Sequence, residues 1–385
     1  MKSSQASLPA IVLVLVLIIC CNFIVGCKED KTQGKKQEEI IETIVLDTTL
    51  TTVKTYCAPR TSSPITIDGK DTDDEWKSAK WSDLFVDIEG QKRKNPNLKT
   101  KVKMMWDETN LYVFAELEEP HIWATLKERD AVVYHDDDFE VFIDPDGDSH
   151  YYYEIEVNAY NTLWDLMLTE PYRNGRNDKV LWRWDIPKLQ SAVHISGTIN
   201  DPSDTDERWN VEMAIPMETL TEFSSGLKPA PGVQWRINFS RVDWQMDIND
   251  GEYQKTKKDD GKNLAESNWV WSPQGKIAMH MPEMWGILQF VDNSDDPFIP
   301  DPDRTLKIEL RNIYKLLLNE HKNNGSFPSD LEKIPLPTID SCTYTFSLES
   351  TSQTFWLSKK SCDTELTWAI DERGRLFQPS QVHLY

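Results

Sequence analysis

The chain has 385 residues, which is enough for one large domain or two ordinary ones, and its formal net charge is −22 from 64 acidic and 42 basic residues. An acidic surface repels phosphate backbones, which argues against a nucleic acid as partner. The chain also carries 15 Trp, 12 Tyr and 13 Phe, more tryptophan than one modest core needs. Either some of these rings face a ligand, or the core is built from bulky aromatic residues.

The N-terminal residues predict a secretory signal that ends in a lipid anchor. Lys2 precedes an apolar run from Ala10 to Cys21, which is too short to span a bilayer comfortably. The letters IVGC follow and resemble a bacterial lipobox, which implies cleavage after Gly26 and acylation of Cys27. A plain signal peptide and an uncleaved anchor are the alternatives. The lipobox predicts a protein of the bacterial cell envelope, lipid-anchored to the membrane on its periplasmic or cell-surface face.

The segments around the predicted cleavage point differ in composition. Residues 1–26 are predicted as a lipoprotein signal peptide, and residues 27–61, which are polar and weakly patterned, as a tether. In an oxidising envelope Cys342 and Cys362 can form a disulfide across a hairpin-sized loop, which leaves Cys57 without a partner. The sequence has no C-x-x-C or His-rich spacing that would indicate a zinc site.

Residues 62–292 are predicted to form an antiparallel β-sandwich. Apolar and polar residues alternate with period 2 in several runs, and Gly, Pro, Asn and Asp separate these runs. Many short strands with few helices are typical of a sandwich. The same periodicity places Trp106, Trp209, Trp235 and Trp285 in the core. The clearest runs are KVKMMW (101–106), LYVFAEL (111–117), FEVFID (139–144), YEIEVNAY (153–160), WNVEMAI (209–215) and VQWRINFSRV (233–242).

The pattern changes after residue 292. Residues 293–302 are rich in Pro and Asp and are predicted as a linker, and residues 303–385 as a small α+β unit of unknown role. In that unit we expect one helix where apolar residues recur at helical spacing, a short second helix at PSDLEKI (328–334), and three strands. The apolar positions are Leu306, Leu310, Ile313 and Leu317, and the strands are TYTFSLE (343–349), TFWLSKK (354–360) and LTWAIDE (366–372).

Seven stretches of the β domain resemble the family 9 carbohydrate-binding modules, and specifically the free-standing family-9-like lipoproteins of bacteria. They occur in the family's order and cover most of residues 64–291. The resemblance implies an immunoglobulin-like or DOMON-like β-sandwich that binds a sugar between aromatic rings and is not itself a catalyst. The stretches are IDGKDTDDEWKSA (67–79), WDETNLYVFAEL (106–117), DDFEVFIDPDGD (137–148), YYEIEVNAYNTLWD (152–165), WNVEMAIP (209–216), WRINFSRVDW (235–244) and WVWSPQGKIAMHMPEMWGILQF (269–290).

The resemblance also implies particular sugar-binding residues. Tyr134 matches the family's first clamp aromatic, Glu140 its hydroxyl-binding glutamate and Asn158 its asparagine. Glu156 stands where the family has a binding arginine, and the second clamp aromatic falls near His280. The structural alternatives are a solvated strand acid for Glu140 and a packed histidine for His280.

The residue pattern is compatible with a sugar site. Aromatic rings cover the apolar faces of a pyranose, while carboxylates, amides and arginine satisfy its polar edges. If residues 139–144 and 153–160 pair as strands, Glu140, Glu156 and Asn158 line one polar face. Arg236 and Asn238 of a neighbouring run can join this face. No Trp stands at the second clamp position, for which Trp269 or Trp271 can substitute, and Trp164, in or near a loop, is a further candidate ring.

The turn DPDGD is a candidate calcium site. Asp144, Asp146 and Asp148 stand at alternate positions, as acids do in calcium loops. Members of the resembled family commonly carry structural calcium, and we expect no other cofactor. The turn lacks the Gly and terminal Glu spacing of an EF-hand, which favours a solvated hairpin turn over a calcium site.

These features predict a lipid-anchored protein that holds a polysaccharide or oligosaccharide at the cell envelope, beside glycosidases, in carbohydrate catabolism. One alternative is a glycoside hydrolase, because Asp138, Glu140, Glu154 and Glu156 supply the carboxylates that such an enzyme pairs. An acidic chain offers such pairs in any case, and no nucleophile elbow, P-loop or Cys–His arrangement occurs, so we assign no catalytic residue. The other alternative is a structural or adaptor lipoprotein that has lost sugar binding.

Overall fold

The computed structural model describes residues 53–175, 178–224, 228–332, 334–336 and 343–381. The predicted signal peptide, the predicted lipidation site Cys27 and the cysteine Cys342 lie outside these residues. Among the described residues, no helix is both long enough and apolar enough to cross a membrane. By its contacts, the described part belongs to one compact unit, Leu46–Tyr385.

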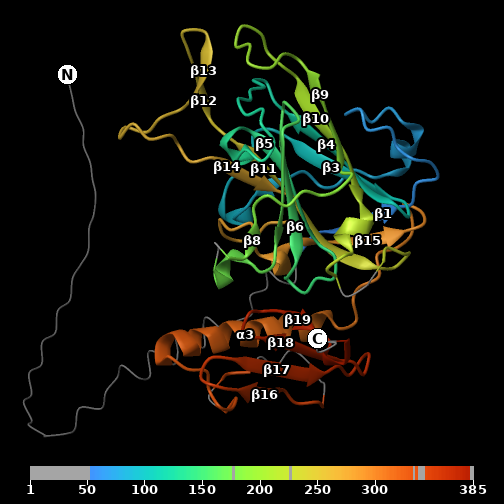
Figure 1. Cartoon of the computed structure of the whole chain (residues 1–385), viewed down its shortest axis with the longest axis vertical. Coiled ribbons are helices and arrows are strands. Elements are labelled where there is room, and N and C mark those ends of the chain that lie inside the picture. The colour runs from blue at the N-terminus through green and yellow to red at the C-terminus, as the bar shows by residue number, and fades with distance from the viewer. Residues whose placement is uncertain (1–52, 176–177, 225–227, 333, 337–342, 382–385) are drawn as a thin grey trace, which may run out of the picture. The chain divides into compact units, whose positions relative to one another are not determined.

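Two sheets form a sandwich (Figure 1). The larger sheet follows the order β1-β15-β11-β5-β6-β7-β8, with β14 paired to β11 and β2 paired to β14. The smaller sheet follows the order β3-β4-β10-β9, and β12 and β13 form a separate hairpin. Neighbouring strands are antiparallel, except that β1 and β15 are parallel. The bounds are β1 (Thr55–Pro59), β2 (Val86–Asp87), β3 (Thr100–Trp106), β4 (Asn110–Glu118), β5 (Asp138–Asp144), β6 (Tyr152–Asn158), β7 (Leu163–Leu168), β8 (Val180–Leu181), β9 (Gln190–Ser196), β10 (Arg208–Pro216), α2 (Met217–Leu220), β11 (Gln234–Asp243), β12 (Met246–Asn249), β13 (Glu252–Lys255), β14 (Ser267–Val270) and β15 (Gly286–Val291).

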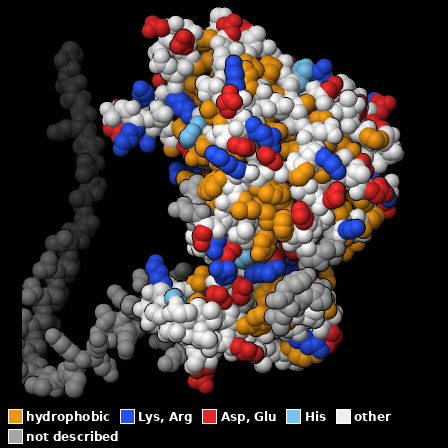
Figure 2. All heavy atoms as spheres, in the orientation of Figure 1, with side chains coloured by type: hydrophobic (Ala, Val, Ile, Leu, Met, Phe, Trp, Pro, Cys, Tyr) orange, Lys and Arg blue, Asp and Glu red, His pale blue; other side chains and the backbone are white. Residues whose placement is uncertain are grey.

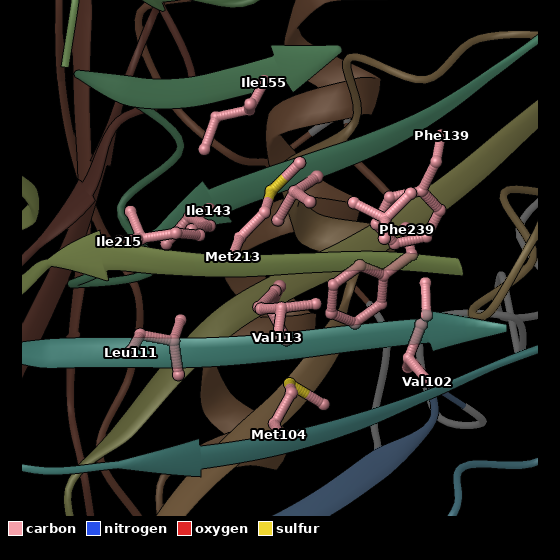
Figure 3. Close-up of a cluster of buried hydrophobic side chains, with 14 of the residues drawn as sticks. Val102, Met104, Leu111, Val113, Phe139, Ile143, Ile155, Met213, Ile215 and Phe239 are labelled. Atoms are coloured by element: carbon pink, nitrogen blue, oxygen red, sulfur yellow. The ribbon is translucent and has the colours of Figure 1, made fainter. Parts of the chain in front are cut away.

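The main core lies between the two sheets, where the inward residues of each strand meet (Figure 3). Phe139 and Ile143 of β5 and Ile155 of β6 face Val113 of β4 and Met213 of β10, and all five are fully buried. Each CH₂ group buried here contributes about 0.8 kcal/mol to folding. The predicted sandwich is confirmed, because the period-2 alternation of these strands matches the two faces of a half-buried sheet.

The predicted core tryptophans are buried in two places. Trp106, Trp209 and Trp235 belong to the core between the sheets, as predicted. Trp285 is also buried, but in a second cluster on the opposite face of the larger sheet, with Phe142 and residues of β6, β7 and β8. The larger sheet is therefore covered with apolar side chains on both faces.

Strand β1 corrects the predicted tether, which was expected to extend to residue 61. Thr55–Pro59 pairs in parallel with β15, with Tyr56 opposite Leu288 and Ala58 opposite Phe290. Tyr56 and Ala58 are buried in the main core, and the Tyr56 hydroxyl donates a hydrogen bond to the Lys80 carbonyl at 2.5 Å. Only Tyr56 and Ala58 of this strand point into the core. An alternation of two apolar residues is too short for the sequence pattern to distinguish a strand from a polar tether.

The C-terminal elements are a helix and a small sheet. Helix α3 (Arg304–Asn324) buries Leu306, Leu310, Ile313 and Leu317, which confirms the predicted helix, and it ends at Gly325, whose φ is 75°. The helix packs on β17 and β18 (Figure 1). The sheet has the order β16-β17-β18-β19, one strand more than predicted. Its strands are β16 (Ser347–Ser350), β17 (Phe355–Lys360), β18 (Thr367–Asp371) and β19 (Leu376–Phe377).

The predicted second helix is wrong for the residues of PSDLEKI that the structure describes, which form bends and a turn. The Asp330 carboxylate accepts a hydrogen bond from the Glu332 backbone N–H at 3.1 Å, a local bond that competes with helix formation. Cys362 is disulfide-bonded, and its predicted partner Cys342 lies outside the described residues. Cys57 is a free cysteine, as predicted.

The surface charge is mixed. Figure 2 shows acidic and basic side chains interspersed over the face in view, with hydrophobic patches between them. The negative net charge of the chain is thus not spread as one uniform field over that face.

Candidate functional site

A pocket of about 390 Å³ lies on the face of the larger sheet that points away from the smaller sheet. Its floor comes from strands β5, β6 and β7, and its walls come from η4 (Val133–His135), η5 (Tyr172–Asn174) and the segment before η6 (Pro282–Met284). Of the predicted sugar-binding residues, the structure brings five together here. They are Tyr134, Glu140, Glu156, Trp164 and His280.

The register of three strands produces the pocket floor. Glu140 of β5 lies opposite Glu156 of β6, which in turn lies opposite Trp164 of β7. In the next row, Phe142 of β5 lies opposite Glu154 of β6. Because side chains alternate along a strand, these residues share the face that Phe139, Val141 and Ile143 do not occupy. The predicted polar face of the β5–β6 pair is therefore confirmed.

Aromatic rings form the sides of the pocket. Tyr134 is half-buried, and its backbone N–H donates a hydrogen bond to Oε2 of Glu156 at 3.1 Å. Trp164 stacks on Trp182, with ring centroids 5.9 Å apart and an interplanar angle of 19°. Tyr172 contributes a third ring, half-buried, from the chain after β7. The pocket thus presents ring surfaces above a floor of carboxylates.

His280 is held among aromatic side chains at the pocket wall. Its Nδ1 and the Tyr152 hydroxyl lie 3.0 Å apart, and its ring centroid is 3.8 Å from that of Tyr172. Its Nε2 lies 3.9 Å from Oε2 of Glu154. His280 is therefore a packed histidine whose edge also lines the pocket.

The floor carboxylates lie in a strongly desolvated environment. Burial raises the pKa of Glu140 to about 7, against an opposing effect of Ser240 on β11, while Glu266 adds to the rise. Burial, with the charges of Asp138, Glu140 and Glu154, raises the pKa of Glu156 well above its usual value. Both shifts have the same physical cause, because a charge is costly where water is scarce.

Asn158 is on the predicted face but does not reach the pocket. Its Nδ2 donates hydrogen bonds to the Leu126 carbonyl at 2.8 Å and to Oδ2 of Asp136 at 2.9 Å. Its Oδ1 accepts bonds from the backbone N–H groups of Tyr160 and Thr162. The side chain is fully buried, and its bonds connect the end of β6 to the segment between β4 and β5 that contains Tyr134.

Arg236 and Asn238 also lie on the predicted face of β11 without lining the pocket. The Asn238 amide is paired with the backbone of Ser272, donating to its carbonyl and accepting from its N–H at 2.9 Å each. Nη1 of Arg236 donates to the Trp285 carbonyl at 2.9 Å, in a different hollow next to α3. The period-2 alternation of a strand predicts on which face of the sheet a side chain lies. It does not predict with which backbone group that side chain forms a hydrogen bond.

Trp271 is placed in the core between the sheets rather than in the pocket. It packs against Phe239, with ring centroids 6.1 Å apart, and only 1% of it is exposed. A Cβ atom on Gly286 would lie 2.2 Å from its ring, so β15 begins with the one residue that fits. Trp269 and Trp271 both belong to the core between the sheets, whereas Asn268, the residue before Trp269, lines the pocket on the other face.

The DPDGD turn is tied to the C-terminal elements. Asp144 accepts hydrogen bonds from the backbone N–H groups of Gly147 and Ser149 at 2.9 Å each. Asp148 pairs with Nε of Arg375 at 2.8 Å, and Nη2 of Arg311 donates to the Ser149 hydroxyl at 2.9 Å. One oxygen each of Asp144, Asp146 and Asp148 could together reach a metal ion. The calcium site in this turn stays a prediction.

Four pocket residues with hydrogen-bonding side chains were not predicted from the sequence as sugar-binding residues. Glu154 is two residues before Glu156 on β6 and therefore lies on the same face of the sheet. The period-2 alternation of this strand could have identified it. Glu266 and Asn268, near the start of β14, reach the pocket through the pairing of β14 with β11. Tyr172 lies outside any strand, and no periodicity marks such a position.

Comparison with known proteins identifies a family that matches the β-sandwich. Residues 67–292 match the family described as carbohydrate family 9 binding domain-like. The endo-1,4-beta-xylanase C of Paenibacillus barcinonensis is 31% identical over 155 residues, a region that spans 40% of this chain and only 12% of that enzyme.

Two similar solved structures are a family 9 carbohydrate-binding module from Caldicellulosiruptor kristjanssonii in complex with cellotriose and the module in complex with glucose. Each is 18% identical to this chain and has 99% of its own length covered. The cellotriose complex covers 64% of this chain with a TM-score of 0.39, and the glucose complex covers 63% with a TM-score of 0.40.

Proposed function

The chain belongs to the carbohydrate family 9 binding domain-like family over residues 67–292, and from that premise we propose that it binds an oligosaccharide or polysaccharide in the pocket on β5, β6 and β7. The observation that carries the proposal is the convergence of Tyr134, Tyr172 and Trp164 around the carboxylates Glu140 and Glu156. These rings come from separate segments of the chain, and the strand register brings them to one place.

The chemistry of the pocket suits a sugar. A pyranose presents C–H groups on its faces, which gain contact with Tyr and Trp rings, and hydroxyl groups on its edges. The carboxylates of Glu140, Glu154 and Glu156 accept hydrogen bonds from hydroxyl donors, and the Asn268 amide offers both a donor and an acceptor. A volume of about 390 Å³ suits one or two sugar rings at the end or side of a longer chain.

A glycan screen of the full chain tests this function. Xylo-oligosaccharides are the first set, because the similar Paenibacillus protein is named as a xylanase, and cello-oligosaccharides and other plant and algal glycans follow. Loss of one stacking ring costs about 0.5–1.5 kcal/mol, so Tyr134→Ala should weaken binding by roughly threefold to tenfold. Tyr344→Ala is the matched control, because Tyr344 is an exposed tyrosine near β16. If no glycan in a broad set binds, or if Tyr134→Ala and wild type bind with equal affinity, the pocket is not a sugar site.

We further propose that the protein is lipid-anchored at the cell envelope and works beside glycosidases. The support is the IVGC sequence, which ends in Cys27 directly after the apolar run and before the charged residues that follow. Cys27→Ala should move the protein from the membrane fraction to the soluble fraction, and mass spectrometry should find acyl chains on residue 27 of the wild type. Unmodified Cys27 in membrane-bound protein would contradict the anchor.

A glycoside hydrolase remains the second candidate, motivated by the close carboxylates of the floor. Cleavage needs one ionised carboxylate beside one protonated carboxyl group across the glycosidic bond. In this pocket burial raises the pKa of both Glu140 and Glu156, so the pair does not combine one carboxyl group of raised pKa with one of lowered pKa. We expect no sugar release from xylan or cellulose by the purified chain. Release that Glu140→Gln abolishes would establish an enzyme instead.

A further inference from the structure

Four groups of three carboxylates in the described residues lie close enough together to hold a metal ion. In three of these groups an arginine forms ion pairs with the acids. The fourth group, which we call the floor cluster, is Asp138, Glu140 and Glu156, and within the described part of the chain no Lys, Arg or His forms an ion pair with it. In the other three groups the ion pairs join Arg241 to Glu119 and Asp243, Arg129 to Asp165 and Asp185, and Arg375 to Asp148.

The floor cluster lies at the bottom of the sugar pocket. Glu140 and Glu156 are directly opposite each other on β5 and β6, and Asp138 is two residues before Glu140 on the same face of β5. One carboxylate oxygen from each of the three lies within 4.8 Å of the others. Asp138 is fully buried, and Glu140 and Glu156 are 5% and 2% exposed.

Two oxygens of the floor cluster are buried without any hydrogen-bond partner. They are Oδ2 of Asp138 and Oε2 of Glu140. Backbone N–H groups donate to Oδ1 of Asp138, from Val242 at 3.3 Å, and to Oε2 of Glu156, from Tyr134 at 3.1 Å. A buried ionised carboxylate that lacks a partner is costly, and the cost is removed either by a proton on the group or by a bound cation beside it.

The surroundings do not provide that charge. The acids Asp137 and Glu154 add negative charge around the cluster. Of the nearby basic side chains, His280 approaches Glu154, and Nζ of Lys255 donates to the His135 carbonyl at 2.5 Å.

We propose that Asp138, Glu140 and Glu156 bind a divalent cation of the calcium class in the floor of the pocket. Calcium takes six to eight oxygen ligands at 2.3–2.6 Å, so two oxygens on one ion lie up to about 5 Å apart, as the cluster requires. Magnesium demands a near-ideal octahedron, and zinc prefers ligand sets with nitrogen or sulfur. Carboxylates from one sheet face supply ligands from one side only, which leaves coordination positions directed toward the pocket.

The coordination positions of the ion that face the pocket can bind hydroxyl groups of the proposed sugar. Glu140 and Glu156 line the pocket directly, so an ion held by them lies where sugar hydroxyl groups would enter. This consequence rests on the proposed function: hydroxyl groups complete the coordination, and sugar binding then depends on calcium. The ion site itself does not depend on it.

Metal binding by the full chain, freed of divalent ions by a chelator, tests the site without any sugar. Calcium should raise the melting temperature of the wild type by several degrees, and terbium should show luminescence sensitised by the pocket aromatics, including Trp164. Glu156→Gln should lose the calcium-induced shift and bind terbium at least tenfold more weakly. In the chelator this variant should melt no lower than wild type, since it removes one buried charge. Glu140→Gln is the second variant, if circular dichroism finds Glu156→Gln unfolded.

Asp146→Asn separates the floor cluster from the DPDGD turn. It should keep the calcium shift if the ion binds at the floor cluster. A shift lost in Asp146→Asn but kept in Glu156→Gln, or no shift in wild type, would overturn the proposal. An amino sugar that binds wild type in the presence of chelator would also overturn it, because an ammonium group would then supply the missing charge. Calcium binding without any glycan binding would reject the proposed function alone, and calcium-independent glycan binding would reject only the coupling.

Discussion

At the scale of single residues, Glu140 shows how strand position determines the chemistry of a side chain. Its neighbours along β5, Phe139 and Val141, point into the core, which directs Glu140 to the opposite face. There it meets Glu156 across the β5–β6 pair. Two acids that are remote in sequence thus become a desolvated pair, and the charge of each is costly in the absence of a cation.

The pH dependence of stability tests this description of Glu140. Burial raises its pKa from 4.5 to about 7, so the folded protein binds this proton more tightly than the unfolded chain. The stability that the protonated group contributes is complete below about pH 4.5 and is lost as the pH rises to about 7. In calcium-free buffer, the free energy of unfolding of wild type should fall relative to that of Glu140→Gln by on the order of 1–3 kcal/mol across this window. Urea titrations at several pH values measure it, and parallel profiles for the two proteins would contradict it.

At the scale of elements, the pocket depends on segments that connect the strands. Tyr134 precedes β5 and is reached through a segment that begins after β4. The amide of Asn158 binds Leu126 and Asp136 in this segment, and the Asp136 carboxylate accepts bonds from the backbone N–H groups of Thr125 and Leu126. Asn158 is therefore a positioning residue for Tyr134, although it does not line the pocket.

Removal of the Asn158 amide should loosen this connection. Asn158→Ala deletes the four hydrogen bonds of a buried side chain, each worth about 0.5–1.5 kcal/mol. We expect a loss of about 2–4 kcal/mol in the free energy of unfolding, together with weaker binding of any glycan that Tyr134→Ala also affects. Asn249→Ala, in the exposed β12–β13 hairpin, should change stability by less than about 0.5 kcal/mol. Unchanged glycan affinity in folded Asn158→Ala would show that Tyr134 is positioned by other contacts.

The sequence predicts the strands of this protein better than the segments that connect them. Period-2 alternation correctly assigned the two faces of β5 and β6, because burial of one sheet face imposes that period. It could not show that the Asn238 amide binds the Ser272 backbone, since side-chain partners depend on which segments cross a sheet. Tyr172 was missed for the related reason that loop positions have no period. Trp271 was misplaced because aromatic content alone does not distinguish a clamp from a core residue.

At the scale of the whole molecule, the C-terminal elements contact the sandwich through charged and polar groups. Arg375 pairs with Asp148, and Leu376 donates its backbone N–H to the Asp148 carbonyl at 3.1 Å. Arg311 of α3, which is 6% exposed, bonds the hydroxyl of Ser149 in the same turn. The DPDGD turn is therefore an attachment point for the C-terminal elements.

Substitution of Arg311 tests this attachment. Arg311→Met keeps much of the side-chain volume but removes the positive charge beside Asp144 and Glu283. Loss of one partner from a buried charge group is strongly destabilising, and we expect a decrease of about 2–4 kcal/mol in the free energy of unfolding. Lys322→Met, at an exposed position of the same helix, is the control. Equal stabilities for the two variants would mean that Arg311 has no role in the attachment.

A crystal structure of the full chain with calcium and the tightest glycan from the screen is the most direct test of the central claim. We predict that a sugar ring lies between Tyr134 and Tyr172, with hydroxyl groups directed toward Glu140 and Glu156. A glycan bound elsewhere, for example in the hollow of about 860 Å³ beside α2, with this pocket empty, would contradict the account.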